Sequence, residues 1–244
     1  MPGSQQCILF QPLAKASSVK LGDVGTVYTD SEGNKYRYCK AGSAALAAGK
    51  IGVAPTATAN HINKAPAADV AVGSKRVSIT VGATVVTEDQ YMGGFLAVND
   101  GTGEGTFYRV LGNSSCDASG TTVVILEDPV RVALTAAGSE VSLVPSPYNG
   151  VVESADEENV PVGVPLCAVA AGYYYWAQIS GVHPAVLVTG TPAVGSILTL
   201  GSTAGSVTTA STTIATTVTQ PIVGTMFATA GVTTEYKPVD LAIY

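Results

Sequence analysis

The chain has 244 residues, of which 46% are hydrophobic and only 12% are charged, and its formal net charge is −6. The hydrophobic content excludes intrinsic disorder, which requires low hydrophobicity and high charge. The acidic balance, with no basic cluster longer than the pair Lys75-Arg76, argues against a nucleic-acid partner.

The predicted elements begin with a β-hairpin followed by a segment without regular structure. Residues 25–29 and 35–40 alternate in character around a polar turn, which is typical of a hairpin. Residues 43–50 hold the best helical pattern, but the segment is short and Gly49 would end it, so we expect no more than one turn. Residues 54–70 are rich in Ala, Thr and Pro, and predict an extended arm or long loop.

The next part of the chain predicts strands joined by turns. The connection at 99–105 contains Asn-Asp-Gly, which tolerates the positive φ of hairpin turns. We predict a β-rich N-terminal domain over residues 1–150, carrying the arm at 54–70, and a second domain over 151–244. The strands expected in the first domain lie at 76–81, 95–98, 106–111, 121–126, 130–134 and 140–144.

The second domain is almost free of charge. No Asp, Glu, Lys or Arg occurs from Asn159 to Thr234, yet Gly and Pro recur every few residues, so the segment does not read as membrane-spanning. Short strands separated by Gly-rich turns predict a β-sandwich or barrel, and the fold class is all-β with little helix. A surface with so little charge favours self-assembly or binding to other protein over a free monomer.

No catalytic, cofactor-binding or metal-binding residue is predicted, so we expect a protein that is not an enzyme. The four cysteines are scattered, which argues against a zinc site and fits a reducing compartment, with two disulfides as an open alternative. The N-terminus has no secretory signal, so we expect synthesis in a cytoplasm. Cys167 and His183 form no recognisable nucleophile motif, and the acidic run 156–158 is expected to be a solvated cluster.

Five residues are candidates for an interface with other subunits. Tyr174 and Trp176 share one face of a predicted strand, and exposed aromatic residues are favoured at protein interfaces and in sugar-binding sites. Thr212 and Thr216 lie in the Thr-rich stretch 208–219, whose β-branched residues predict an uncharged edge strand that invites pairing. His61 lies in the predicted arm, either at a contact or in local hydrogen bonds.

Several segments together resemble structural proteins of tailed bacteriophages, in particular capsid decoration (cement) proteins. They are K-Y-R-Y-C-K-A-G at 35–42, the arm at 54–61, D-Q-Y-M-G-G-F-L-A-V-N-D at 89–100, L-E-D-P-V-R-V-A-L at 126–134, P-Y-N-G-V-V at 147–152, and the closing G-Y-Y-Y-W-A-Q, Q-P-I-V-G and E-Y-K-P-V-D-L.

The resemblance implies a virion protein made in the host bacterial cytoplasm and placed on the capsid surface. Its implied partners are the major capsid protein and further copies of the chain in a homotrimer, with no nucleic acid, membrane or cofactor. Two other interpretations stay open: a tail, baseplate or head-fibre component, and a carbohydrate-binding module that uses Tyr174 and Trp176.

Overall fold

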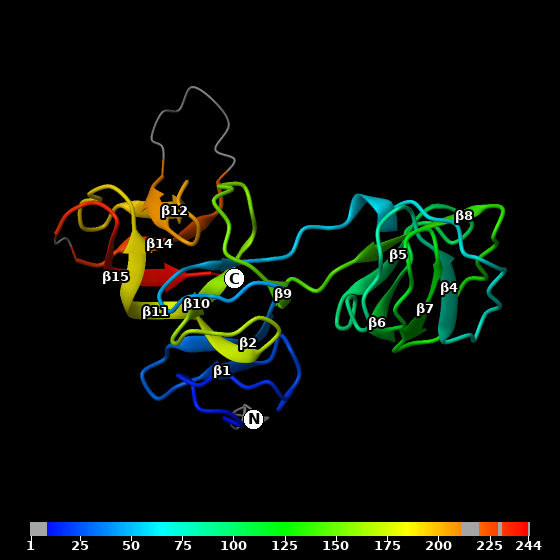
Figure 1. The fold of residues 1–244 in the computed structure, drawn as a ribbon, viewed down its shortest axis with the longest axis horizontal. Coiled ribbons are helices and arrows are strands. Elements are labelled where there is room, and N and C mark those ends of the chain that lie inside the picture. The colour runs from blue at the N-terminus through cyan, green and yellow to red at the C-terminus, as the bar shows by residue number, and fades with distance from the viewer. Residues whose placement is uncertain (1–8, 211–219, 229–230, 244) are drawn as a thin grey trace, which may run out of the picture. The chain divides into compact units, whose positions relative to one another are not determined.

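The computed structural model describes residues 9–210, 220–228 and 231–243. The chain forms two compact units (Figure 1). One unit, which we call the flanking unit, combines Met1–Ala54 with Gly150–Tyr244, and the other, the inserted unit, is Pro55–Asn149. This division differs from the two consecutive domains predicted at 1–150 and 151–244. The boundary near residue 150 is where the chain leaves the inserted unit, but the first 54 residues fold with the C-terminal half.

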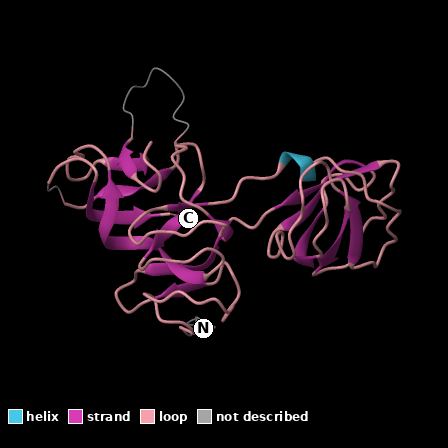
Figure 2. Ribbon diagram, viewed as in Figure 1, coloured by secondary structure: helices cyan, strands magenta, loops and turns pink. Residues whose placement is uncertain are grey.

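Nearly all of the regular structure is β-strand, which confirms the predicted all-β class (Figure 2). Within the described residues the one helical element is the 3-10 turn η1 (Ala59–His61). Residues 43–50 form turns and bends with no helix.

The C-terminal half of the flanking unit is a closed five-stranded barrel. Each strand hydrogen-bonds to the next around the ring β11-β13-β12-β14-β15, and β15 pairs again with β11. All pairs are antiparallel except β11 with β13. Alternate side chains point inward and fill the barrel with aliphatic residues. The strands are β11 (Tyr174–Val188), β12 (Ile197–Leu200), β13 (Val207–Thr209), β14 (Ile222–Met226) and β15 (Glu235–Ala242).

The strand β11 is long enough to belong to two sheet regions. Its second half closes the barrel, whereas residues 174–180 pair with β2 (Lys35–Ala41), which is the second strand of the predicted hairpin. This pairing is the physical reason that the N-terminal residues join the C-terminal half. The smaller strands of this region are β1 (Val27–Thr29), β3 (Gly52–Val53), β9 (Asn149–Val151) and β10 (Pro161–Pro165).

The chain leaves and re-enters the flanking unit at one point. Val53 and Val152 form an antiparallel bridge, with hydrogen bonds of 2.8 Å and 3.1 Å between their backbone amides and carbonyls. The two ends of the inserted unit therefore start from adjacent, hydrogen-bonded residues.

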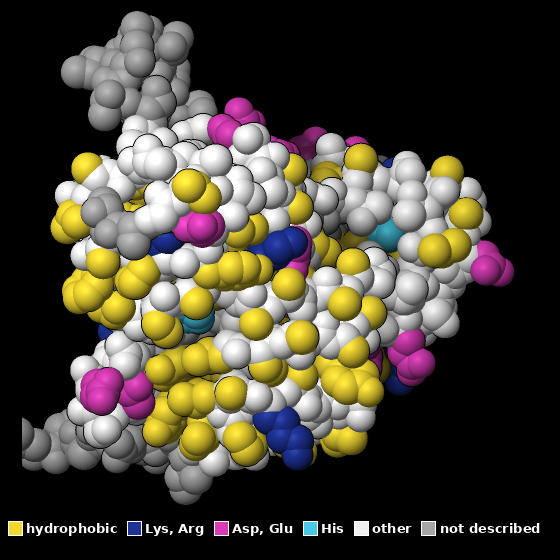
Figure 3. Space-filling model, turned by 60° about the vertical axis from the view of Figure 1, so that its left-hand side comes forward, with side chains coloured by type: hydrophobic (Ala, Val, Ile, Leu, Met, Phe, Trp, Pro, Cys, Tyr) yellow, Lys and Arg dark blue, Asp and Glu magenta, His cyan; other side chains and the backbone are white. Residues whose placement is uncertain are grey.

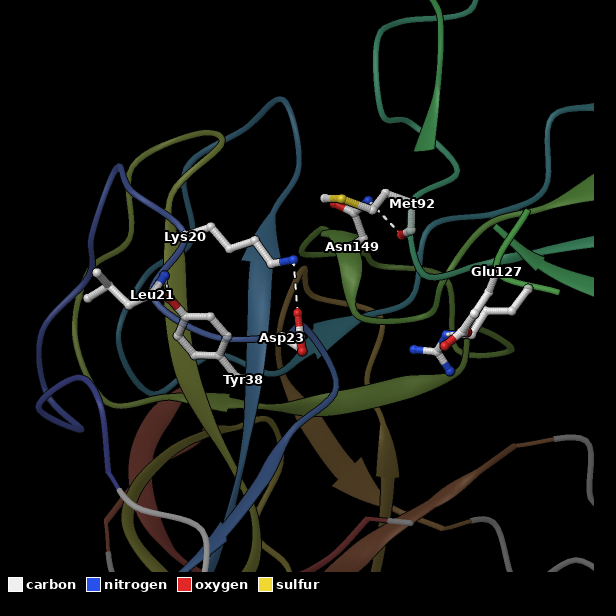
Figure 4. Close-up of polar contacts among 8 residues, drawn as sticks. Lys20, Leu21, Asp23, Tyr38, Met92, Glu127 and Asn149 are labelled. Atoms are coloured by element: carbon white, nitrogen blue, oxygen red, sulfur yellow. Dashed lines mark hydrogen bonds and ion pairs between the residues drawn. The ribbon is translucent and has the colours of Figure 1, made fainter. Parts of the chain in front are cut away.

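The inserted unit is a five-stranded antiparallel sheet in the order β4-β7-β6-β5-β8 around its own aliphatic core. At its C-terminal end the side-chain amide of Asn149 donates to the backbone carbonyl of Met92 at 3.2 Å (Figure 4). The strands are β4 (Arg76–Thr80), β5 (Phe95–Gly101), β6 (Phe107–Asn113), β7 (Thr121–Leu126) and β8 (Ser139–Val144).

The segment 54–70 is a long loop, but it lies along its own unit and does not extend away as an arm. Lys64 forms a bridge with Val141 of the edge strand β8, and Pro66 forms one with Ile79 of the opposite edge strand β4. The loop thus links the two edges of the sheet through backbone hydrogen bonds.

Gly49 lies against β11 and leaves no room for a side chain. Its φ is +75°, and a Cβ atom there would lie 2.3 Å from the carbonyl oxygen of Ala185. We expect Gly49→Ala to lower the free energy of unfolding by about 2–4 kcal/mol, which combines backbone strain with overpacking. The measurement is chemical denaturation of the purified protein.

The matched control is Gly172→Ala in the same unit, where φ is +74° and nothing lies within 4 Å of the added Cβ. Only the backbone strain applies there, so we expect a loss of about 1 kcal/mol. Equal losses in the two variants would contradict the close contact at Gly49.

Candidate functional site

The two aromatic candidates for an interface lie inside the flanking unit. Trp176 is fully buried and Tyr174 is 8% exposed, because an N-terminal segment covers this face of β2 and β11. The indole Nε1 of Trp176 donates to the backbone carbonyl of Gln11 at 3.0 Å. The hydroxyl of Tyr38 accepts from the backbone amide of Leu21 at 3.3 Å (Figure 4).

This burial corrects the prediction that Tyr174 and Trp176 contact other subunits, since both side chains serve the core of their own unit. The carbohydrate-binding alternative loses the two rings that it was predicted to use. An exposed aromatic neighbour does exist: Tyr173 is 38% exposed.

His61 is likewise a core residue of the inserted unit. It is fully buried, with Nδ1 2.6 Å from the hydroxyl of Tyr91 and Nε2 3.0 Å from the carbonyl oxygen of Thr84. A carbonyl can only accept, so Nε2 carries the proton and Nδ1 accepts from the tyrosine. The prediction of His61 as a contact residue is corrected, and local hydrogen bonds are what it makes.

Thr212 and Thr216 lie outside the described residues. The described start of the Thr-rich stretch belongs to β13, which pairs with β12 on one side and β11 on the other. It is therefore an internal strand of the barrel and not an edge.

We looked among the described residues for side chains that could bind a metal ion or act as a nucleophile. Within ranges 9–210, 220–228 and 231–243 no three His, Cys, Asp or Glu side chains gather where a metal ion could bind. Cys39, Cys116 and Cys167 are free thiols, and burial raises the pKa of the Cys39 and Cys167 thiols. A raised thiol pKa disfavours the thiolate, which is the nucleophilic form. None of the helices in the described part of the chain is long and apolar enough to cross a membrane.

The barrel instead presents an apolar outer surface, which we call the barrel wall (Val182, Ile197, Thr225, Phe227 and Asp240). Ile197 of β12 pairs with Thr225 of β14. On its other side Thr225 pairs with Asp240 of β15, which pairs with Val182 of β11. Phe227 is 55% exposed and Ile197 is 49% exposed, so this row of side chains faces outward.

The wall carries one charge. Among the five barrel strands, charged residues occur only on β15, at Glu235, Lys237 and Asp240. Lys237 is buried, and its ammonium group donates to the carbonyl of Gly190 at 3.3 Å. Glu235, at the start of β15, accepts from the backbone amide of Val232 outside the wall, so Asp240 is the one charged residue among the five that form the wall. Figure 3 shows a face on which hydrophobic side chains form patches among uncharged atoms, with a small number of charged side chains between them.

A second apolar surface lies at one end of the barrel, which we call the barrel mouth (Gly190, Val194, Val232 and Thr233). The backbone amide of Gly190 donates to the hydroxyl of Thr233 at 2.7 Å and so joins the loop after β11 to the turn before β15. Val194 and Val232 are 63% and 65% exposed. A single exposed apolar residue is ordinary, whereas grouped ones mark interaction sites, and the mouth carries two on joined loops.

The inserted unit has an apolar face of its own, which we call the aromatic stripe (Phe95, Phe107, Arg109, Leu111 and Val144). Phe95 of β5 pairs with Val144 on one side and Arg109 on the other. The ring of Phe107, which is 58% exposed, meets that of Phe95 edge-on with 5.8 Å between the ring centroids. Arg109 lies 3.4 Å from the carboxylate of Glu127, which Figure 4 labels.

The segment without Asp, Glu, Lys or Arg covers most of the barrel, but the residues that form the barrel wall and the barrel mouth were not predicted from the sequence. The signal that marks them is an apolar residue at an outward position of a strand, as in I-V-G-T-M-F at 222–227.

Comparisons with known proteins give no match. The chain matches no protein-family model, no curated protein sequence and no solved structure.

His183 makes the stability of the flanking unit depend on pH. The ring is 5% exposed, Nδ1 accepts from the backbone amide of Ala185 at 3.2 Å, and burial lowers the pKa of His183 below its ordinary value of 6.5. The unfolded chain therefore binds a proton more readily than the folded one, and stability falls as pH drops below about 6.5.

We expect His183→Gln, whose amide oxygen can accept from Ala185, to show a smaller loss of stability between pH 7 and pH 5 than the wild type. Thermal melts of both proteins across this range measure it. Because His61 and all carboxylates are common to both, parallel pH profiles would contradict the role of His183.

Proposed function

We propose that the chain is a virion structural protein of a tailed bacteriophage, a capsid decoration protein that binds the shell of major capsid protein and stabilises it without catalysis. The observation that carries the proposal is the exposed apolar surface of a barrel whose sequence has no Asp, Glu, Lys or Arg from Asn159 to Thr234. Such a surface gains most when other protein covers it.

The mechanism is binding to the assembled state. A protein that binds the closed shell but not its separate subunits shifts the equilibrium toward the shell by mass action. The barrel mouth supplies the capsid contact in this proposal, since Val194 and Val232 are exposed on neighbouring loops and offer apolar area for a partner to bury.

A closed barrel also fits a role beside many other subunits. It has no unpaired strand edge, so partners contact its side chains and do not extend its sheet. The second partner in the proposal is the chain itself, as a homotrimer on the capsid surface.

The test is co-sedimentation of purified protein with capsid shells of its phage that lack it. We expect Val194→Asp and Val232→Asp each to weaken shell binding by at least tenfold, because each would bury an unpaired carboxylate. The matched control is Val19→Asp, at an equally exposed valine (62%) away from the barrel, which should bind as the wild type does.

Electron microscopy of labelled virions fixes the location. Labels on the head support the proposal, whereas labels on the tail or baseplate, or wild-type protein that fails to bind shells, contradict it.

A further inference from the structure

The barrel wall and the aromatic stripe are alike in one respect: each has a charged residue in a row of apolar or uncharged side chains on adjacent strands. On the barrel wall, Asp240 lies between Thr225 and Val182 of the adjacent strands. On the aromatic stripe of the inserted unit, Phe95 lies between Val144 and Arg109. The wall row carries the carboxylate of Asp240, and the stripe row carries the guanidinium of Arg109, whose ion-pair partner Glu127 lies beside it just after β7.

The cations of the stripe are available to a partner. Arg109 and Glu127 have half-exposed side chains (51% and 52%), and an ion pair this exposed contributes little. The guanidinium has five donors in a planar fork and uses only its Nε toward Glu127, so donors remain for a second carboxylate. A second guanidinium lies nearby, since Arg131 donates from Nη2 to the backbone carbonyl of Phe107 at 3.1 Å and lies over the ring of Tyr108.

These charges select among the possible pairings of the two surfaces. Wall against wall would bring Asp240 of two copies together, and stripe against stripe would bring together two copies of Arg109. Like charges facing each other across an interface disfavour the contact. Wall against stripe places the carboxylate beside the guanidinium and leaves the apolar side chains of both rows to pack.

We propose that the barrel wall of one copy docks on the aromatic stripe of a second copy, with Asp240 paired to Arg109 of that copy. Every copy has one wall and one stripe, so the contact is heterologous and repeats head to tail, and it forms a ring where the rotation between copies closes. Closure after three copies gives the homotrimer. This inference deepens the self-association within the proposed function and leaves the barrel mouth free for the capsid.

The experiment is sedimentation equilibrium of the free full-length protein, without capsids. The wild type should reach about 74 kDa, three times the chain mass of 24.6 kDa. Asp240→Arg and Arg109→Asp should each weaken association by at least tenfold, because each places like charges in contact. The double variant Asp240→Arg/Arg109→Asp restores opposite charges in reversed order and should associate as the wild type does.

The control is Asp23→Arg, a charge reversal of a surface carboxylate in the same unit as Asp240 whose side chain is 91% exposed, which should leave association unchanged. Thermal melts confirm that each variant is folded. A monomeric wild type, single variants that associate normally, or a folded double variant that stays monomeric would each overturn the inference. None of these results would touch shell binding, whose failure appears only in the co-sedimentation experiment.

Discussion

The backbone pairing of β11 is the constraint on which the flanking unit depends. The first half of this continuous strand hydrogen-bonds to β2 and β10, and its second half to β15 and β13. The strand therefore belongs both to the barrel and to the sheet that carries Tyr38, Tyr174 and Trp176. Its partner β2 lies more than 130 residues earlier in the chain, with the whole inserted unit between them. Because the entropy cost of closing a loop grows only slowly with its length, a folded insertion of this size is compatible with the pairing.

Sequence patterns predicted the strands better than their partners. The alternation at 35–40 marks β2 as a strand, but no local pattern says that it pairs with β11, and so the discontinuous unit escaped prediction. The loop at 54–70 has no periodicity because it links the sheet edges through its backbone, at Lys64 and Ala67, and such hydrogen bonds leave no side-chain signature.

The sequence indicated the region of the candidate surface but not the residues that form it. Tyr174 and Trp176 lie on a strand with both faces covered, and their cover comes from irregular residues such as Phe10 and Leu13 that no strand or helix pattern reveals. The lack of charge from 159 to 234 predicts a surface suited to protein contact, and this stays a prediction. Alternation along a strand separates its two faces but does not say which face is buried. That choice depends on how the strands close into a barrel, which is a tertiary property.

The bridge between Val53 and Val152 makes the inserted unit modular. Because the chain departs and returns at adjacent hydrogen-bonded residues, the flanking unit keeps all of its own strand pairings whatever lies between them. A lineage of such proteins can therefore lengthen, shorten or exchange the cassette between these two valines while the host fold persists. Insertions of different length at this position are therefore compatible with the strand pairings of the flanking unit.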